Sequence, residues 1–167
     1  MTRLVLSLLA ALSIGTAVHA TEPATIEEVV AAATRNMDFV DSEYLKKRQA
    51  QNAALLLLDV RTQREYDAGH IPGSVWMERG IVEFRMARMV RDPDAEIVVY
   101  CAVGNRSALV VKALREIGYR NVKAHTGFNA WVTAGNAYEN DLGRSTMIEL
   151  RAINAATNAR SMAGSSD

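Results

Sequence analysis

Two uninterrupted apolar runs, ALLLLDV at residues 54–60 and EIVVYC at residues 96–101, constrain the fold of this chain more than any other feature. Neither run has the period of a helix, and a continuous apolar run of this length is typical of a strand buried on both faces of a parallel sheet. Between and around them lie segments with helical periodicity, most clearly SALVVKALREIGY at residues 107–119. This alternation predicts an α/β domain with a mostly parallel sheet.

The remaining segments follow the same alternation. We predict one domain over residues 21–136, beginning with an N-terminal helix, and a helical extension with a frayed end over residues 137–167. The extension is expected to be helical because apolar residues recur at helical spacing in STMIELRAIN. The other predicted elements are helices at 24–37, 42–51, 62–69 and 81–90 and between Gly127 and Gly135, and strands at 75–77 and 121–125.

The first twenty residues differ from the rest of the chain. After Arg3, fifteen residues carry no charge, and the segment ends in VHA, which resembles a small-x-small cleavage site. These features are typical of a secretory signal peptide. The alternative is an uncleaved membrane anchor, but fifteen helical residues span only about 22 Å of a hydrocarbon core of roughly 30 Å. We therefore predict cleavage after Ala20 and a periplasmic or secreted protein that is not held at a membrane.

The charged residues give no reason to expect a nucleic-acid partner. The chain has 19 Lys and Arg against 19 Asp and Glu, and the two signs intermingle along the sequence. Its three histidines are scattered and it has a single cysteine, so no metal-ligand cluster is predicted. No metal and no organic cofactor is expected.

Cys101 is that single cysteine, and it follows the second apolar run. Ligands of open α/β sheets bind at the carboxyl ends of strands, and a helix N-terminus at this position lowers the pKa of a thiol. Gly104 and Asn105 tolerate the backbone conformations of a tight turn, and Arg106 adds positive charge. The alternative is a buried, inert thiol. We predict a nucleophilic Cys101 in an active-site loop that also contains Ala102, Val103, Gly104, Asn105 and Arg106.

The spacing from Cys101 to Arg106 is C-x4-R, one residue shorter than the C-x5-R loop of cysteine-dependent phosphatases. LLLLDVRTQREYDAGHIPGSVWM, IVVYCAVGNRSALVVKALREIGYRNV and GFNAW occur in that order within residues 55–131. With this loop and these segments, the chain resembles a single-domain rhodanese, a sulfurtransferase. The resemblance implies a three-layer α/β/α fold with a mostly parallel five-stranded sheet.

The resemblance also implies a reaction. A donor such as thiosulfate, a polysulfide or a persulfide would give sulfane sulfur to Cys101, and a thiol or cyanide would accept it from the resulting persulfide. Glutathione and a thioredoxin-like protein are the expected kinds of cellular acceptor. Two alternatives remain open at this point: a non-enzymatic sulfur carrier or protein-binding module, and a phosphatase or arsenate reductase on the same scaffold.

Further roles are implied for residues outside the loop. Asp59 and Arg61 match the family's DVR segment, which lies near the loop, and they would either contact substrate or order the loop as an ion pair. Two-domain members bind thiosulfate through an arginine where this chain has Glu65. The adjacent Arg64 is therefore a further residue that would contact substrate or order the loop. Whether thiosulfate is the natural donor is therefore left open. His70 is expected to have a structural role in its turn.

Overall fold

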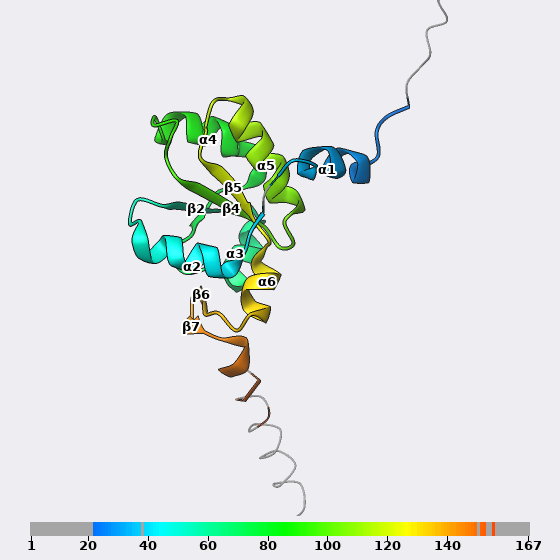
Figure 1. Cartoon of the computed structure of the whole chain (residues 1–167). Helices are drawn as coiled ribbons and strands as arrows, with labels where there is room; N and C mark the ends of the chain where they lie inside the picture. The colour runs from blue at the N-terminus through cyan, green and yellow to red at the C-terminus, as the bar shows by residue number, and fades with distance from the viewer. Residues whose placement is uncertain (1–21, 38, 150, 153–154, 156–167) are drawn as a thin grey trace, which may run out of the picture.

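The computed structural model describes residues 22–37, 39–149, 151–152 and 155. The predicted signal peptide lies outside these residues. Within them, five strands form one parallel sheet with the order β1-β5-β4-β2-β3 (Figure 1). The strands are β1 (Phe39–Val40), β2 (Leu56–Asp59), β3 (Val75–Trp76), β4 (Ile97–Tyr100) and β5 (Val122–His125).

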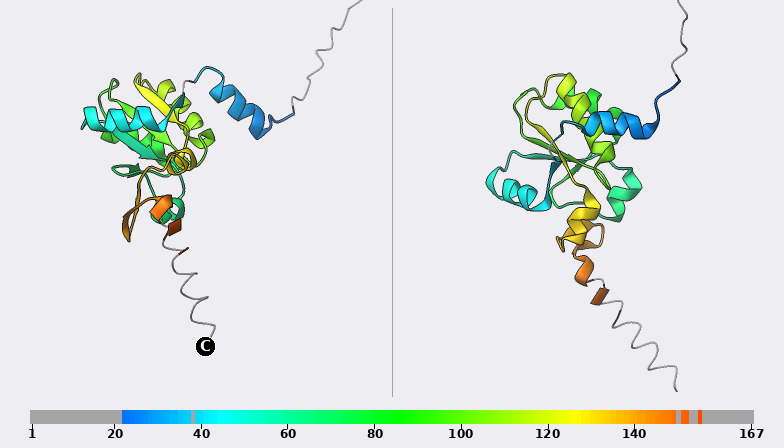
Figure 2. Two further views of the ribbon diagram at one scale, coloured as in Figure 1. Left: turned by 60° about the horizontal axis from the view of Figure 1, so that its bottom comes forward. Right: turned by 45° about the vertical axis from the view of Figure 1, so that its right-hand side comes forward.

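Helices cover both faces of this sheet, as Figures 1 and 2 show. One face packs on α4 (Val82–Met89) and α5 (Asn105–Glu116), and the other on α2 (Ser42–Gln51) and α6 (Phe128–Thr133). The predicted three-layer α/β/α fold is thereby confirmed. None of the described helices combines the length and the apolar character needed to cross a membrane. The other helices are α1 (Ile26–Thr34), which packs on α5, the short α3 (Gln63–Ala68), and the 3-10 turn η1 (Arg79–Ile81).

The apolar runs are continuous because their strands contribute to both cores. Leu58 and Val99 pack among residues of α4 and α5, whereas Leu57 and Val98 pack with Leu45 and Trp131 of α2 and α6. All four residues of β4 are fully buried. A strand in this position has no face on which a polar residue could meet solvent, so the alternating pattern of a half-exposed strand is absent.

The register of the two central strands brings the predicted site residues to one edge of the sheet. β2 runs parallel to β4, with Asp59 opposite Tyr100. The segments that follow the two strands therefore begin next to each other. Arg61 lies in the segment after β2, and Cys101 in the segment after β4.

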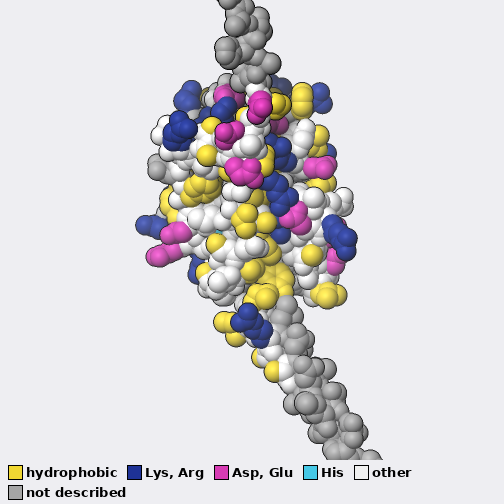
Figure 3. All heavy atoms as spheres, turned by 90° about the vertical axis from the view of Figure 1, so that its right-hand side faces the viewer, with side chains coloured by type: hydrophobic (Ala, Val, Ile, Leu, Met, Phe, Trp, Pro, Cys, Tyr) yellow, Lys and Arg dark blue, Asp and Glu magenta, His cyan; other side chains and the backbone are white. Residues whose placement is uncertain are grey.

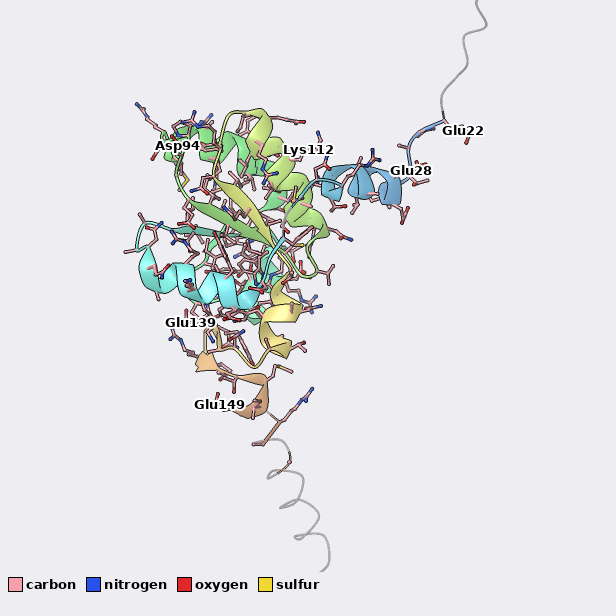
Figure 4. The ribbon with its side chains drawn as sticks, in the orientation of Figure 1. Glu22, Glu28, Asp94, Lys112, Glu139 and Glu149 are labelled. Atoms are coloured by element: carbon pink, nitrogen blue, oxygen red, sulfur yellow. The ribbon has the colours of Figure 1, made fainter. Side chains whose placement is uncertain are left out.

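The C-terminal extension contains an element that the sequence analysis did not predict. Residues of β6 (Tyr138–Asn140) and β7 (Gly143–Ser145) form an antiparallel hairpin. In its turn, the side-chain oxygen of Asn140 accepts a hydrogen bond from the N–H of Leu142 at 3.0 Å. Gly143 has a φ of +111°, which glycine adopts readily. The next described residues, 147–149 and 151–152, are helical. Glu139 and Glu149, labelled in Figure 4, mark the hairpin and this segment, at the end of the molecule opposite Asp94.

Candidate active site

The loop that follows β4 folds around the side chain of Cys101, which is only 1% exposed. The loop enters α5 through Gly104, the N-cap, whose φ of +92° is a left-handed value that glycine adopts without strain. The N–H of Gly104 donates to the Sγ atom of Cys101 at 3.2 Å, and the hydroxyl of Ser107 donates to the Gly104 carbonyl oxygen at 2.8 Å. The residues predicted as an active-site loop thus form one turn around the thiol.

The position of this sulfur favours negative charge on it. The N–H groups in the first turn of a helix have no acceptor within the helix, and the helix dipole places partial positive charge at that end. The hydrogen bond from Gly104 adds a donor aimed directly at the sulfur. A negative charge on this sulfur would therefore have a hydrogen-bond donor and the positive end of a helix dipole beside it.

Arg106, the last residue of the loop, is held by a carboxylate from α3. Its two terminal nitrogens donate to the two carboxylate oxygens of Glu65 at 2.7 and 2.9 Å. The hydrogen bonds from Arg106, together with those from the N–H and hydroxyl of Thr62, lower the pKa of Glu65 to about 2 in spite of its partial burial. Glu65 is thus ionised at neutral pH and offsets much of the charge of Arg106. The sequence does not predict that Glu65 pairs with Arg106, because the two residues are 41 positions apart.

Asp59 and Arg61 form a buried ion pair beneath the loop. Their side chains are 0% and 4% exposed, and an Arg61 terminal nitrogen lies 2.6 Å from an Asp59 carboxylate oxygen. The same nitrogen donates to the carbonyl oxygen of Gly69 at 2.6 Å, and the guanidinium lies 4.2 Å from the centre of the Phe128 ring. The pair thus connects the end of β2 to Gly69 after α3 and to Phe128 at the start of α6. Arg64 is exposed on α3, and among the described residues it makes no hydrogen bond to the loop.

The N-terminus of α6 supports the loop from behind. The N–H groups of Phe128 and Asn129 donate to the carbonyl oxygens of Cys101 and Ala102 at 2.7 and 3.1 Å. A Cβ atom at Gly127 would lie 2.4 Å from the Ala102 carbonyl oxygen, so only glycine fits there. The sequence predicts a short helix between Gly127 and Gly135, and α6 confirms it. The close contact between Gly127 and Ala102 could not be predicted from the sequence, because it depends on how α6 packs against the loop.

A buried histidine fixes the start of α6. His125 is fully buried, and its Nδ1 accepts from the N–H of Gly127 at 3.0 Å. The other ring nitrogen therefore carries the proton and donates to the Ser42 hydroxyl at 3.3 Å. Burial lowers the pKa of His125 to about 4, against a smaller opposing effect of Asp41. This neutral histidine positions the loop through Gly127, a role that the sequence analysis did not identify.

His70 lies in the turn after α3, as expected of a structural residue. Its backbone exchanges two hydrogen bonds with Glu139 of the hairpin, at 2.8 and 2.9 Å, and its ring stacks on Tyr66. No group of three or more possible metal-ligating side chains occurs in the part of the chain that the structure describes. The described site offers one buried thiol whose sulfur accepts a hydrogen bond from the Gly104 N–H.

A family model and a curated relative both place this chain in the same protein family. The family model described as "Rhodanese-like domain" matches residues 41–134, more than half of the chain. A curated protein from Allochromatium vinosum named "Sulfurtransferase" is 34% identical over 97 residues, which cover 58% of this chain and 89% of that protein.

Solved structures share the fold of this chain. The polysulfide-sulfur transferase homodimer of Wolinella succinogenes is 28% identical, with a TM-score of 0.60, over 68% of this chain and 86% of that one. A protein of unknown function from Rhodopseudomonas palustris, described as a possible tyrosine phosphatase, is 30% identical, also with a TM-score of 0.60, over 70% and 95% of the two chains.

Proposed function

Because the chain belongs to the rhodanese-like family and is a single-domain sulfurtransferase, we propose that it moves sulfane sulfur from a donor to a thiol or to cyanide through a persulfide on Cys101. The observation that carries the proposal is the hydrogen bond from the Gly104 N–H to the Sγ of Cys101 at 3.2 Å, at the N-terminus of α5. A donor group aimed at this sulfur stabilises the anion that both half-reactions need.

In the first half-reaction the Cys101 thiolate attacks the sulfane sulfur of the donor. A bond forms between Sγ and that sulfur, and the bond from that sulfur to the rest of the donor breaks. The leaving group departs with the electron pair, as sulfite from thiosulfate, as a shortened chain from a polysulfide, or as a thiolate from a persulfide. No other oxidant or reductant is needed.

In the second half-reaction the acceptor attacks the outer sulfur of the persulfide. A thiolate acceptor forms a new sulfur–sulfur bond, the bond to Sγ breaks, and Cys101 leaves as the thiolate from which the cycle began. The N–H groups at the start of α5 stabilise this leaving group as they stabilised the nucleophile. The cycle is a double displacement with one covalent intermediate.

The charge at the mouth of the site favours some donors over others. Thiosulfate carries two negative charges, and Arg106 is the cation of the loop. Since Glu65 binds both terminal nitrogens of Arg106, the loop offers that dianion less positive charge than an unpaired arginine would. A persulfide that carries no more than one negative charge is therefore the preferred donor in this proposal. The name of the Wolinella protein, a polysulfide-sulfur transferase, supports only the weaker point that the donor need not be thiosulfate.

A panel of donors and acceptors tests the proposed function. Steady-state sulfur transfer from thiosulfate, polysulfide and glutathione persulfide to cyanide and to glutathione would be measured for the protein and for Cys101→Ser. We expect transfer with at least one pair and loss of more than about a thousandfold in the variant, since the nucleophile is removed. Transfer that survives in Cys101→Ser would contradict the proposal. Hydrolysis of an aryl phosphate that depends on Cys101, without sulfur transfer, would instead favour the phosphatase alternative.

A further inference from the structure

We propose that a pocket between the active-site loop and the C-terminal hairpin binds the apolar body of a small aliphatic thiol, the acceptor in the second half-reaction. The pocket has a volume of about 370 Å³. Its inner wall contains Ala102 of the loop and Glu65, and its outer walls contain Phe128, Val132, Tyr138 and Met147. This inference rests on the proposed function and adds to it the chemical class of the acceptor.

The pocket adjoins the reactive sulfur through the backbone of the loop. Ala102 follows Cys101 directly, and the Glu65 carboxylate binds Arg106 at the other end of the same loop. A molecule in the pocket therefore touches the loop at Ala102, the residue next to the thiol. On the face shown in Figure 3, hydrophobic side chains gather just above the segment that leads to the C-terminus.

The charged groups of the pocket already have partners. Glu65 is bound to Arg106, and Arg61 is bound to Asp59 and to the carbonyl oxygen of Gly69. The surface that remains available to a ligand is therefore mainly apolar. It comes from Phe128, Val132 and Met147. Such a surface selects an uncharged hydrocarbon body through its removal from water.

The hairpin makes this wall rigid. The Tyr138 ring is 6% exposed and packs so closely on Gly69 that a Cβ there would lie 2.8 Å from the ring. The ring also meets Phe128 edge-on, with 6.2 Å between centroids. Tyr138 and Met147 lie beyond residues 41–134, the part that the family model matches. These two residues of the wall therefore lie outside the matched domain, whereas Phe128 and Val132 lie within it.

The acceptor, more than the donor, can use this pocket because of where its target sulfur lies. Cys101 is nearly inaccessible, so a donor must reach deep into the loop to deliver its sulfur. In the persulfide, the outer sulfur stands about 2 Å farther from Sγ, along the new bond. A thiolate R–S⁻ attacks that sulfur with its body outside the loop. The products are R–S–SH and the Cys101 thiolate, and the bond that breaks is the one to Sγ.

A series of thiols of equal charge tests the inference. The full-length protein would be loaded with polysulfide, freed of excess reagent, and its Cys101 persulfide confirmed by mass. Its discharge would then be followed with ethanethiol, butanethiol and hexanethiol. We expect the second-order rate constant to rise at least about tenfold from ethanethiol to hexanethiol, because each buried methylene contributes favourable transfer free energy.

Two variants of the same extension locate the effect. Met147 lines the pocket, whereas Leu142 lies in the hairpin turn, is 96% exposed and does not line it. Met147→Ser should reduce the rise to less than about threefold, while Leu142→Ser should change neither the rise nor the ethanethiol rate. Val132→Ser provides a second change in the pocket wall.

The outcomes separate this inference from the function on which it rests. A rate constant that does not depend on chain length would overturn the pocket assignment, and so would a dependence that survives in both Met147→Ser and Val132→Ser. If no persulfide forms before any thiol is added, the proposed function itself fails and the inference fails with it.

Discussion

Gly127 lies so close to Ala102 that the backbone of α6 touches the backbone of the active-site loop with no side chain between them. A Cβ atom at Gly127 would be 2.4 Å from the Ala102 carbonyl oxygen and 2.8 Å from the nitrogen of Val103. The next two N–H groups donate to the carbonyl oxygens of Cys101 and Ala102. The loop is thus supported on one side by α5, which it enters, and on the other by α6.

Gly127→Ala should therefore damage both stability and catalysis. Its φ of +114° and the overlap with the loop would each act against a side chain. Gly118→Ala is the matched control, because Gly118 has a φ of +112° but nothing within 4 Å of the added Cβ. We expect the control to lower the free energy of unfolding by about 1 to 3 kcal/mol through backbone strain alone.

The Gly127→Ala variant should lose more stability than this control and should also lose sulfur transfer by at least about tenfold, because the loop must shift. Chemical denaturation and steady-state kinetics measure the two effects. Equal losses in the two variants would show that the contact with Ala102 does not matter.

Glu65→Gln should improve the use of thiosulfate. Glutamine can keep the hydrogen bonds of the helix cap to Thr62, but it no longer neutralises Arg106. We expect KM for thiosulfate to fall about three- to tenfold at low ionic strength, with the effect reduced by salt, and KM for an alkyl persulfide, which carries at most one negative charge, to change less than about twofold. Glu116→Gln, which removes an exposed pair with Lys112, is the control. An unchanged ratio of the two KM values would argue against a role of Glu65 in donor choice.

Asp59→Asn should reveal whether the ion pair with Arg61 is structural. Both side chains are buried, so removal of the negative charge leaves a buried guanidinium without its counter-charge. The free energy of unfolding should fall by about 3 to 5 kcal/mol. Asp94→Asn, which breaks an exposed pair with Arg120, should change it little. A variant of full stability with a raised KM for the donor would instead show that Asp59 acts through substrate contact.

His125 should make the protein less stable in mild acid. Its pKa in the folded state is about 4 because of burial, whereas a histidine in an unfolded chain has a pKa of about 6.5. The unfolded chain thus binds the proton first as the pH falls. The contribution of His125 to stability is complete above about pH 6.5 and is lost between about pH 6.5 and 4, by up to about 3 kcal/mol.

Denaturation curves from pH 7 to 5 measure this loss, and His125→Asn should flatten it. The carboxylates of Glu65 and Glu96, whose pKa values are about 2, lose their contributions only at lower pH, below about 4.5, where their unfolded forms begin to bind protons. A wild-type slope between pH 7 and 5 that persists in His125→Asn would mean that another group is responsible.

The sequence predicted the features of this molecule that depend on local pattern. The buried strands that end at Asp59 and Tyr100 were visible as continuous apolar runs, and the turn after Cys101 as a cysteine followed by glycine and arginine. The sequence analysis did not predict the C-terminal hairpin, because the helical spacing of the apolar residues after it indicated a helix for the whole extension. Residues typical of a turn are nevertheless present between Asn140 and Gly143.

Contacts between distant segments were beyond prediction. Glu65 meets Arg106 only because α3 and the loop after β4 lie at the same edge of the sheet. His125 was counted as one of three scattered histidines, yet it holds Gly127 in place. In both cases the partner is set by the register of parallel strands and by helix packing, and no spacing in the sequence encodes it.

The central claim is that Cys101 carries the transferred sulfur, and its mass tests this most directly. The protein would be treated with polysulfide and digested without reductant. The mass of the peptide that contains Cys101 would then be measured by mass spectrometry. We predict a gain of about 32 Da, one sulfur atom, that disappears on addition of a thiol and is absent in Cys101→Ser. A protein that transfers sulfur while this peptide keeps its unmodified mass throughout would contradict the account.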